Sequence, residues 1–547
     1  MTPYHSEDFT PDEQAILRRY FTNLDAPVFA LVNLPEVVKG ALFARYSRSA
    51  KSLRRLFLDE FVSELDIAGD VTVDATIGLE RAEALYDKVF VEYGDDSVAQ
   101  LGGVHLACEQ ASNVLTKILE WGRLMSYLEQ STRYIGYDAR LGGRYRYHRP
   151  PEILSSPLGA RYVGDMDAMF DTYASLLPRM VDHFKSLTPK SPDDSDFVYR
   201  QAVRAKAFDA IRGLLPAASL SNVGIYGTGQ GYEQLLLRMR ASALPEARAY
   251  ADAMLVELRK VIPSFLKRVD VEDRGGAWSR YLATNRDATA EVTARLLGDD
   301  APAAEESRVT LVDFDPDGEV KMVAAMLYAS SHLPEVEIER RVQAMSVEDR
   351  IAVVRAYVGE RTNRRHRPGR ALERTSYRFD VLSDYGAFRD LQRHRLLTVE
   401  WQTLSPRHGF VRPESVADAG VMGEFDEAMG VSAGLHAELA EMFPAQAPYA
   451  VSLAYRVRYT MQMNAREAMH LIELRSGPQG HPAYRTVAHD MHLLISDVAG
   501  HRAVAEMMRF VDHSDDAELE RLDAERRSEQ RRAGTPPSGP DSQPSIT

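Results

Sequence analysis

Cysteine is almost absent from the sequence: Cys108 is the only one among 547 residues. A single thiol excludes an internal disulfide and any zinc or iron–sulfur site that needs several cysteines. Cys108 falls on an apolar stripe, which favours a small packed side chain over a nucleophile. The motifs HExxH, GxSxG and the Walker loop are also missing, so zinc-protease, serine-hydrolase and P-loop chemistry are not indicated.

Long hydrophobic runs are missing too. No apolar stretch reaches the length that spans a bilayer. The first residues, MTPYHSEDFT, are polar and acidic, unlike a signal peptide. We therefore expect a soluble, cytoplasmic protein that has no membrane partner.

Positive charge is in deficit, because 66 Lys and Arg face 80 Asp and Glu, for a net charge of −14. Neutralising the phosphates of a nucleic acid needs an excess of cations, so this balance argues against a nucleic-acid partner. It leaves room for a local basic pocket that binds a small phosphate ligand.

What is present is typical of a large globular protein, with 45% hydrophobic and 27% charged residues. Apolar residues at helical spacing predict helices over 104–122 and 377–388, and β-branched residues predict a strand over 309–314. The glycine-rich segment 227–231 precedes another predicted helix. This mixture indicates an α+β, helix-rich fold.

A linker is expected near the middle of the chain. The segment 298–306 is acidic and rich in small residues, and it contains a proline. The end of the chain is charged and then rich in Pro, Ser and Gly, a composition that cannot bury a core. We therefore predict a first domain over 1–296, a linker over 297–308, a second domain over 309–514 and a disordered tail over 515–547.

The two halves contain related segments in the same order. The pairs are 41–47 with 325–330, 121–126 with 393–398, 147–152 with 410–414, and 236–242 with 472–476. Their offset of roughly 240–280 residues favours domain duplication over a short-period solenoid.

Polar segments near these repeats have two readings each. Consecutive hydroxyls and an arginine in 129–134, after an expected helix, suit a phosphate monoester or form an ordinary polar loop. The triplet Arg393-His394-Arg395 could contact a pyrophosphate or an aromatic ring, or simply favour a helix C-terminus. The basic cluster at 364–370 is a solvated loop or a phosphate site. The polar side chains of the helical segment 464–475 could form one binding face, or they could be the ordinary polar face of an amphipathic helix.

Together these segments resemble the flavin-dependent thymidylate synthases, whose motif is RHRxxSxNExSxRY. In the first half, 121–134 keeps the ExSxRY part and loses the first Arg and the His. In the second half, Arg393-His394-Arg395 keeps the triplet, Thr403 stands at the serine position, and the ExSxRY part is lost. The resemblance therefore implies two tandem copies, each helix-rich with small antiparallel sheets.

Further landmarks extend the resemblance. Ser97 lies in a counterpart of the family's GHxSxxEH segment, and Glu373 lies in its second-half equivalent. Arg212 stands before Leu-Pro, where the family contacts the nucleotide, and Asn464-Ala465-Arg466 resembles its flavin-contacting Asn-x-Arg. Arg240 and Arg475 match the late arginine that acts on the uracil ring, with Arg238 as a rival to Arg240.

The resemblance implies a composite site, because each half keeps what the other has lost. The expected nucleotide ligands are Glu129, Gln130, Ser131, Thr132, Arg133 and Arg212. The expected flavin ligands are Arg393, His394, Arg395, Glu373, Asn464, Arg466 and Ser97. Arg475 and Arg240 would be catalytic, and no metal is expected.

The implied reaction is reductive methylation of dUMP to dTMP with FAD, methylenetetrahydrofolate and NADPH. One chain would be a pseudo-dimer, and a homodimer would form a pseudo-tetramer. The alternatives are a catalytically inactive or re-purposed flavin or pyrimidine-nucleotide binder, a related enzyme with another pyrimidine or one-carbon donor, and a nucleic-acid binder that uses the cluster at 361–370.

Overall fold

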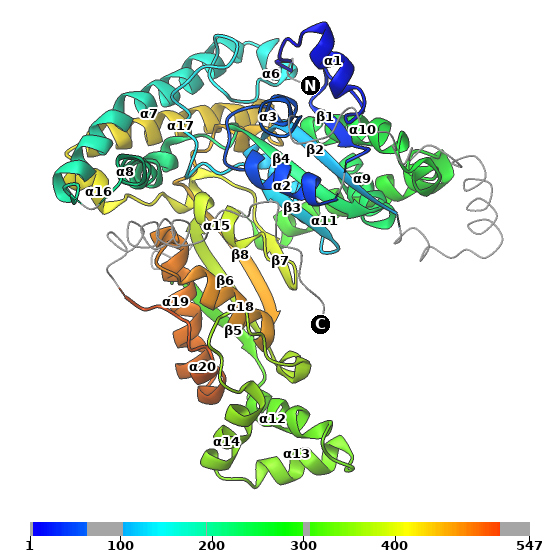
Figure 1. Ribbon diagram of the computed structural model, residues 1–547, viewed down its shortest axis with the longest axis vertical. Helices are drawn as coiled ribbons and strands as arrows, with labels where there is room; N and C mark the ends of the chain where they lie inside the picture. The colour runs from blue at the N-terminus through cyan, green and yellow to red at the C-terminus, as the bar shows by residue number, and fades with distance from the viewer. Residues whose placement is uncertain (1–3, 35, 63–101, 193, 299–306, 515–547) are drawn as a thin grey trace, which may run out of the picture. The chain divides into compact units, whose positions relative to one another are not determined.

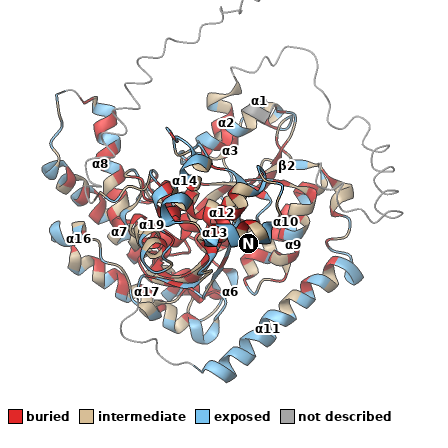
Figure 2. Cartoon of the chain, turned by 90° about the horizontal axis from the view of Figure 1, so that it is seen from below, coloured by how far each residue is buried: buried red, intermediate tan, exposed pale blue. Residues whose placement is uncertain are grey.

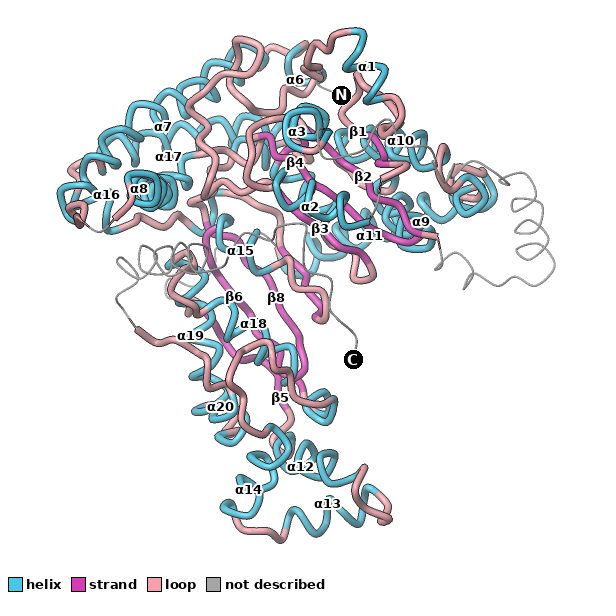
Figure 3. The backbone as a smooth tube through the Cα atoms, viewed as in Figure 1, coloured by secondary structure: helices cyan, strands magenta, loops and turns pink. Residues whose placement is uncertain are grey.

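The computed structural model describes residues 4–34, 36–62, 102–192, 194–298 and 307–514 (Figure 1). Over these residues the protein is a helix-rich α+β structure with two small sheets of four strands each, and the α+β, helix-rich class agrees with the expectation from the sequence. Figure 3 shows the strands in magenta among the helices. Within the described residues, no helix combines the length and apolar character that crossing a membrane requires.

The first sheet has the strand order β1-β2-β4-β3, and all its neighbours are antiparallel. Its strands are β1 (Val28–Leu31), β2 (Gly103–Ser112), β3 (Met125–Glu129) and β4 (Leu220–Thr228). The second sheet has the order β5-β6-β8-β7. Its strands are β5 (Val309–Phe314), β6 (Ser376–Asp384), β7 (Leu397–Trp401) and β8 (Arg456–Asn464). The two orders are equivalent, which confirms that the chain contains two copies of one folding unit.

In both copies, two strands run directly into helices. Strands β2 and β6 continue into α5 (Asn113–Leu119) and α15 (Tyr385–Leu391), and β4 and β8 continue into α9 (Gly229–Arg240) and α18 (Ala465–Arg475). The last strand residue caps each helix, because its side-chain oxygen accepts from the third helical amide. The four caps are Ser112, Asp384, Thr228 and Asn464, with donor–acceptor distances of 3.0, 2.9, 3.2 and 2.9 Å.

The helices predicted over 104–122 and 377–388 are therefore wrong in their first parts, which are strands β2 and β6. The apolar residues that suggested a helix, Val104 and Cys108 on β2 and Tyr377 and Val381 on β6, are four apart, and a spacing of four fits the period of a strand as well as that of a helix. Leu106 and Phe379, midway between them, complete the alternation of a strand. The strand at 309–314 and the helix at 464–475 are confirmed, and Cys108 is fully buried on β2.

The chain divides into two compact units, and each gathers segments from both halves. Unit 1 comprises 1–177, 211–308 and 380–462, and unit 2 comprises 178–210, 309–379 and 463–547. The linker and tail predicted at 297–308 and 515–547 stay predictions, because 299–306 and the tail lie outside the described residues.

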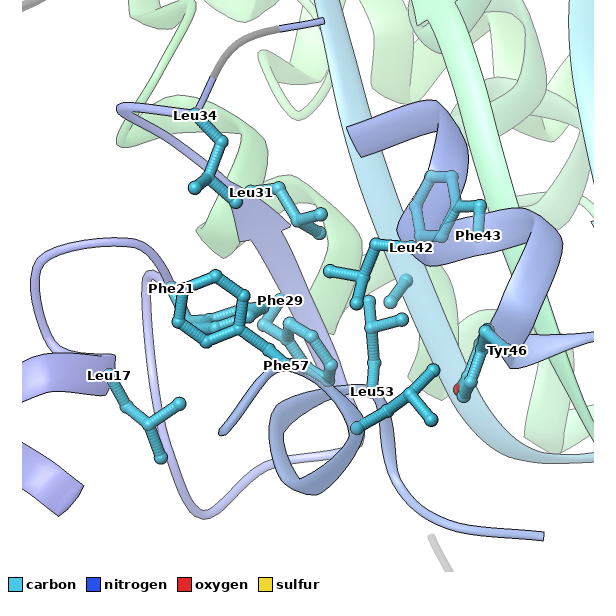
Figure 4. Close-up of a cluster of buried hydrophobic side chains, with 12 residues drawn as sticks. Leu17, Phe21, Phe29, Leu31, Leu34, Leu42, Phe43, Tyr46, Leu53 and Phe57 are labelled. Carbon is cyan, nitrogen blue, oxygen red and sulfur yellow. The ribbon is translucent and has the colours of Figure 1, made fainter. Parts of the chain in front are cut away.

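Unit 1 has a core beside β1, where aromatic side chains interlock (Figure 4). The ring centroids of Phe21 and Phe29 lie 5.6 Å apart, and those of Phe21 and Phe57 lie 5.4 Å apart. The remaining helices of at least eight residues that lie wholly in this unit are α2 (Glu36–Tyr46), α3 (Leu53–Glu60), α10 (Pro245–Arg259), α11 (Ala277–Leu297) and α17 (Met422–Met442). Figure 2 shows that α11 is largely exposed, whereas α10 carries many buried residues.

Unit 2 is built mainly from helices around β5. Those of at least eight residues that lie wholly within it, besides α18, are α12 (Gly318–Tyr328), α13 (Glu335–Gln343), α14 (Val347–Val358) and α19 (Pro482–Asp497). A buried ion pair stabilises this unit: both guanidinium NH groups of Arg361 donate to the Glu473 carboxylate, at 2.7 and 2.6 Å.

Candidate functional site

The segment expected to bind a nucleotide phosphate begins at the end of β3, not after a helix as expected. Strand β3 lies at the edge of the first sheet and pairs with β4 so that Glu129 is opposite Val223. Glu129 is only 3% exposed. A carboxylate at such a position must be paired with cations or hydrogen-bond donors, because burying an isolated charge is costly.

The partners of Glu129 come from both halves of the chain. Arg389 NH2 donates to Glu129 Oε1 at 2.8 Å, Lys117 Nζ donates to Oε2 at 3.2 Å, and Arg393 NH1 lies 3.8 Å from Oε2. Burial acts to raise the pKa of Glu129, but the charges of Arg389, Lys117 and Arg393 outweigh it and hold the pKa below its ordinary value. The carboxylate is therefore ionised at neutral pH.

Further charges extend this arrangement into a network that we call the inter-half ion cluster. Lys117 Nζ donates to Glu120 at 2.5 Å, Arg393 donates to Asp390, and Arg212 NH1 lies 3.5 Å from Asp390. The first half contributes Lys117, Glu120, Glu129 and Arg212, and the second half contributes Arg389, Asp390 and Arg393. All seven belong to unit 1.

The rest of the predicted phosphate segment is tied to residues just after α2. Gln130 Nε2 donates to the Ser49 carbonyl at 2.7 Å, and the Ser131 amide donates to the Ser47 carbonyl at 3.1 Å. Thr132 and Arg133 are buried as well. The Gln130 side chain and the Ser131 backbone thus tie this segment to residues 47–49 in a largely buried turn.

Arg212 lies close to the same cluster. It directly follows α8 (Asp196–Ile211) and is only 4% exposed. Its NH2 atom is buried without a hydrogen-bond partner. A Cβ built on Gly386, in the first turn of α15, would lie 3.3 Å from that atom. Arg212 therefore combines one ion-paired face with an unsatisfied donor, which is a suitable arrangement for an additional anionic oxygen.

A cavity of about 380 Å³ lies beside the cluster, and we call it the triplet cavity. Residues of both triplets line it, namely Trp121, Gly122 and Arg123 from the first half and His394 and Arg395 from the second. Strand β7 and helix α9 supply other walls, including Thr398 and Arg238. The two repeats, far apart in sequence, thus meet around one hollow.

The first-half triplet is engaged in packing. Trp121 Nε1 donates to the Val399 carbonyl at 3.2 Å, and its ring packs edge-on against Trp401 with 5.1 Å between centroids. Arg123 NH2 donates to Thr398 Oγ1 at 2.8 Å. Trp121, which stands in place of the family's first Arg, and the retained Arg123 therefore stabilise contacts between the two halves.

Two cations of the triplet cavity have unsatisfied donors. Arg238 lies 5.2 Å from the Trp121 ring centroid, and Arg395 lies 5.5 Å from that of Tyr127. The Nε atom of each arginine is buried without a hydrogen-bond partner. Burial also lowers the pKa of Arg238. Both arginines are half-buried in the cavity wall, and their guanidinium groups suit a ligand that carries carbonyl or anionic oxygens.

Arg240, the predicted catalytic arginine of the first half, has a different environment. Its NH1 atom lies 2.8 Å from Asp252 Oδ1 on α10. Among the described residues that line the triplet cavity, α9 contributes Arg238 and not Arg240. The local geometry therefore favours Arg238 as the residue that meets a ligand there.

Four other predicted site residues belong to unit 2. Arg466 donates to Glu373 at 3.2 Å and to the Pro368 carbonyl at 3.0 Å, and Asn464 caps α18. The Arg475 guanidinium lies 5.4 Å from the Tyr484 ring centroid. Ser97 lies outside the described residues.

Sequence reasoning missed Lys117, Glu120, Arg389 and Gln392. Lys117 and Arg389 both stand four residues before the first residue of their triplet, and Glu120 and Gln392 stand directly before it. All four are buried. A detectable signal existed, because charged or amide side chains at equivalent positions of two repeats interrupt otherwise apolar segments.

Two relatives from different organisms match this chain over nearly its whole length. A UPF0159 protein of Chlamydia muridarum is 38% identical over 95% of this chain and 98% of its own length. A UPF0159 protein of Thermoplasma acidophilum is 31% identical over 91% of this chain and 99% of its own length. The solved UMP/dUMP methylase PolB of Streptomyces cacaoi, bound with 5-Br UMP, matches 39% of this chain and 100% of its own, with 18% identity and a TM-score of 0.28.

The family described as thymidylate synthase complementing protein matches two separate stretches, residues 43–264 and 310–500. These stretches fall on either side of the chain's midpoint and include both triplets, β3, β7 and the residues of the inter-half ion cluster. The chain therefore belongs to the thymidylate synthase complementing protein family.

Proposed function

We propose that this protein is a flavin-dependent thymidylate synthase-like enzyme that converts dUMP to dTMP at a site made from both halves of the chain. The observation that carries the proposal is the 2.8 Å bond between Glu129 and Arg389, which joins the first half's retained motif to the helix preceding the second half's retained triplet. Family membership supplies the reaction class.

The nucleotide end of the site is assigned to Gln130, Ser131, Thr132, Arg133 and Arg212. Hydroxyls, amides and guanidinium groups are the donors that a phosphate monoester needs. Arg212 adds a buried donor that is still unsatisfied. In this proposal Glu129 acts as a positioning residue, because its carboxylate is already occupied by Arg389 and Lys117.

The flavin end is assigned to the triplet cavity, with His394 and Arg395 in its wall. The guanidinium groups of Arg395 and Arg238 suit the carbonyl oxygens or phosphates of FAD. Arg393 would hold the orientation of the triplet through Asp390 and Glu129. Ser97, Glu373, Asn464 and Arg466 complete the set by resemblance to the family.

When bound, FAD supplies hydride chemistry, with methylenetetrahydrofolate as the carbon donor and NADPH as the source of reducing equivalents. The protein's part is to bind, orient and polarise. A late arginine, Arg475 or its first-half equivalent near Arg240, would stabilise negative charge that develops on the pyrimidine ring. We further propose that the protein acts in the cytoplasm as a homodimer.

A second candidate is a flavin or pyrimidine-nucleotide binder without turnover. The observation that favours it is the conversion of Trp121 and Trp401 to packing residues, since these positions correspond to functional residues of the family motif. In the enzyme proposal, the same observation means that a chain keeps only one functional composite site.

One set of assays separates these functions. The full-length protein is purified, its absorbance spectrum is recorded, and dTMP formation from dUMP is followed with NADPH and methylenetetrahydrofolate. A bound flavin with NADPH-dependent dTMP supports the enzyme. A protein that binds FAD and dUMP without forming dTMP is a binder, and turnover of UMP instead of dUMP identifies another pyrimidine substrate. Absence of any flavin binding overturns the proposal.

A further inference from the structure

The basic cluster at 364–370 has no assigned ligand. It belongs to a segment of unit 2 between α14 and β6, which we call the arginine loop and define as residues 361–370. The loop contains five arginines and a histidine but no acidic residue, in a chain whose net charge is −14. Because like charges repel one another, a loop that gathers so many cations requires a reason.

The backbone of the arginine loop is held from the interior of unit 2. Arg361 is only 2% exposed, and its Nε donates to the His366 carbonyl at 2.7 Å. Its NH2 donates to the Arg364 carbonyl at 3.1 Å. Further along the loop, Arg466 Nε donates to the Pro368 carbonyl at 3.0 Å. Three alternate carbonyl groups of the loop are therefore bound to cations of the protein.

The two ends of the loop are also closely packed. The Glu473 carboxylate accepts from both NH groups of Arg361, at 2.7 and 2.6 Å. At the other end, a Cβ built on Gly369 would lie 2.1 Å from Tyr357 Oη, and this hydroxyl accepts from the Ala371 amide at 3.2 Å. A loop whose backbone is already fixed loses less conformational entropy when its side chains bind a ligand.

The exposed side chains of the loop include cations that are not neutralised. Arg365 and Arg367 are exposed, and Arg364 is half-buried. Among the described residues, none forms an ion pair with these three guanidinium groups. Arg370, in contrast, is paired with Glu373 at 3.0 Å. Since three carbonyl groups that would repel an anion are already occupied, the loop suits a ligand with several negative charges.

Phosphate groups fit such a loop best, because the planar guanidinium matches two phosphate oxygens at once. A single phosphate monoester would leave part of three cations unneutralised. A dinucleotide that carries a further phosphate on its ribose offers both a pyrophosphate and a monoester. In dinucleotide-binding proteins, arginine is also the residue that accommodates the ribose 2′-phosphate.

We propose that the arginine loop binds the phosphates of NADPH, and that Arg365 and Arg367 recognise its ribose 2′-phosphate. The proposal rests on the proposed function, since that function supplies NADPH as the source of reducing equivalents. It adds a binding site for this co-substrate and a preference for NADPH over NADH.

Binding of the oxidised coenzymes tests the site without turnover. Full-length wild-type protein is titrated calorimetrically with NADP+ and with NAD+ at one salt concentration. We expect NADP+ to bind about tenfold or more tightly, because NAD+ lacks the phosphate that accepts charge-assisted hydrogen bonds. Arg365→Gln/Arg367→Gln should bind NADP+ about tenfold more weakly and NAD+ within about twofold of wild type, so that the preference disappears.

Arg274→Gln/Arg295→Gln is the matched control. It removes the same charge from two exposed arginines of unit 1, neither of which forms an ion pair with another described residue. This variant should keep the wild-type preference, which separates a specific phosphate contact from a change in net charge.

The outcomes distinguish the two proposals. Failure of the wild type to bind NADP+, equal affinity for NADP+ and NAD+, or a preference that survives in Arg365→Gln/Arg367→Gln overturns the NADPH site. A double variant that loses binding of FAD or of a DNA duplex instead of NADP+ also overturns it, because the loop would then serve a flavin or a nucleic acid.

If wild-type protein forms dTMP without preferring NADP+ to NAD+, the proposed function stands and the NADPH site is overturned. If it prefers NADP+ through the two arginines but forms no dTMP, the NADPH site stands and the proposed function is overturned.

Discussion

Glu129 and Arg389 form a buried hydrogen-bonded ion pair of 2.8 Å between two copies of a duplicated fold. Glu129 ends β3 of the first copy, and Arg389 lies on α15 of the second. Neither side chain is more than 6% exposed. A carboxylate of the first copy is thus neutralised by a cation of the second, so the two copies form one structural unit around this pair.

Arg389→Met should strongly destabilise the protein, because it leaves the Glu129 carboxylate buried with one fewer cation. Breaking a buried pair on one side costs about 3–5 kcal/mol, which urea unfolding of the full-length protein would measure. Arg45→Met removes the exposed Arg45–Glu60 pair, with side chains 52% and 32% exposed, as a control. There we expect a loss of about 1 kcal/mol or less, and equal losses in both variants would contradict the assignment.

The contribution of Glu129 to stability should disappear in acid. Its folded pKa lies below the ordinary value of 4.5, because Arg389, Lys117 and Arg393 outweigh burial. The contribution is therefore complete above pH 4.5 and declines as the pH falls below it.

The difference in unfolding free energy between wild type and Glu129→Gln measures this effect. It should shrink below pH 4.5 and stay constant near neutrality. Glu120 has the opposite sign, since burial and the nearby Glu129 raise its pKa. Because Glu129→Gln also removes one cause of the raised Glu120 pKa, both proteins are compared in a Glu120→Gln background, and a pH-independent difference there would exclude the proposed linkage.

Nucleotide and flavin binding should respond to different arginines. Arg133→Ala is expected to weaken dUMP binding about tenfold or more while FAD stays bound, because a charge-assisted bond to phosphate is lost. Arg395→Ala should do the reverse, since Arg395 lines the triplet cavity. Calorimetric titration of each variant with each ligand tests this, and parallel loss of both ligands in both variants would refute the division.

Arg238 and Arg240 provide a second matched pair on one helix. Arg238→Ala removes a cavity-lining guanidinium and should lower FAD affinity about tenfold. Arg240→Ala only breaks a pair with the exposed Asp252 and should leave FAD affinity within about twofold of wild type. A larger loss of FAD affinity in Arg240→Ala than in Arg238→Ala would contradict the choice of Arg238 as the residue that meets a ligand in the cavity.

Restoring the family's arginine at Trp121 should not create a second site. Trp121→Arg removes the contact with Trp401 and the bond to Val399, and loss of a packed tryptophan costs about 3–5 kcal/mol. The number of flavins bound per chain should stay unchanged, as measured by absorbance of the purified variant. An increase in flavin content would show that the first triplet is only dormant.

The duplication could be predicted from the sequence, because short motifs repeat in the same order in both halves, and the α+β class could be predicted from the mixture of helical and strand patterns. The shared strand order of the two sheets confirms the duplication. The helical reading of 104–122 failed at β2, because Val104 and Cys108, four residues apart, share one face of a strand as well as of a helix. The caps Ser112 and Asp384 were the local signals that a helix begins there.

The triplets and the 129–134 segment were found from sequence, but the cluster that joins them was not. Lys117 and Arg389 each look like a charged residue on an amphipathic helix, and the shared partner Glu129 becomes evident only when the two copies fold together. Pairings between residues so distant in sequence carry no local periodicity, so spacing could not reveal them.

Mutual neutralisation across the inter-half ion cluster also constrains how this chain could ever be divided. A polypeptide ending at the midpoint would carry the Glu129 carboxylate without Arg389 and Arg393, and the complementary piece would carry those cations without their anion. Lys117 would still pair with Glu129 and Asp390 with Arg393, but the buried Arg389 would lose its carboxylate and Glu129 its closest cation. Independent copies would therefore each need a new buried partner at this position.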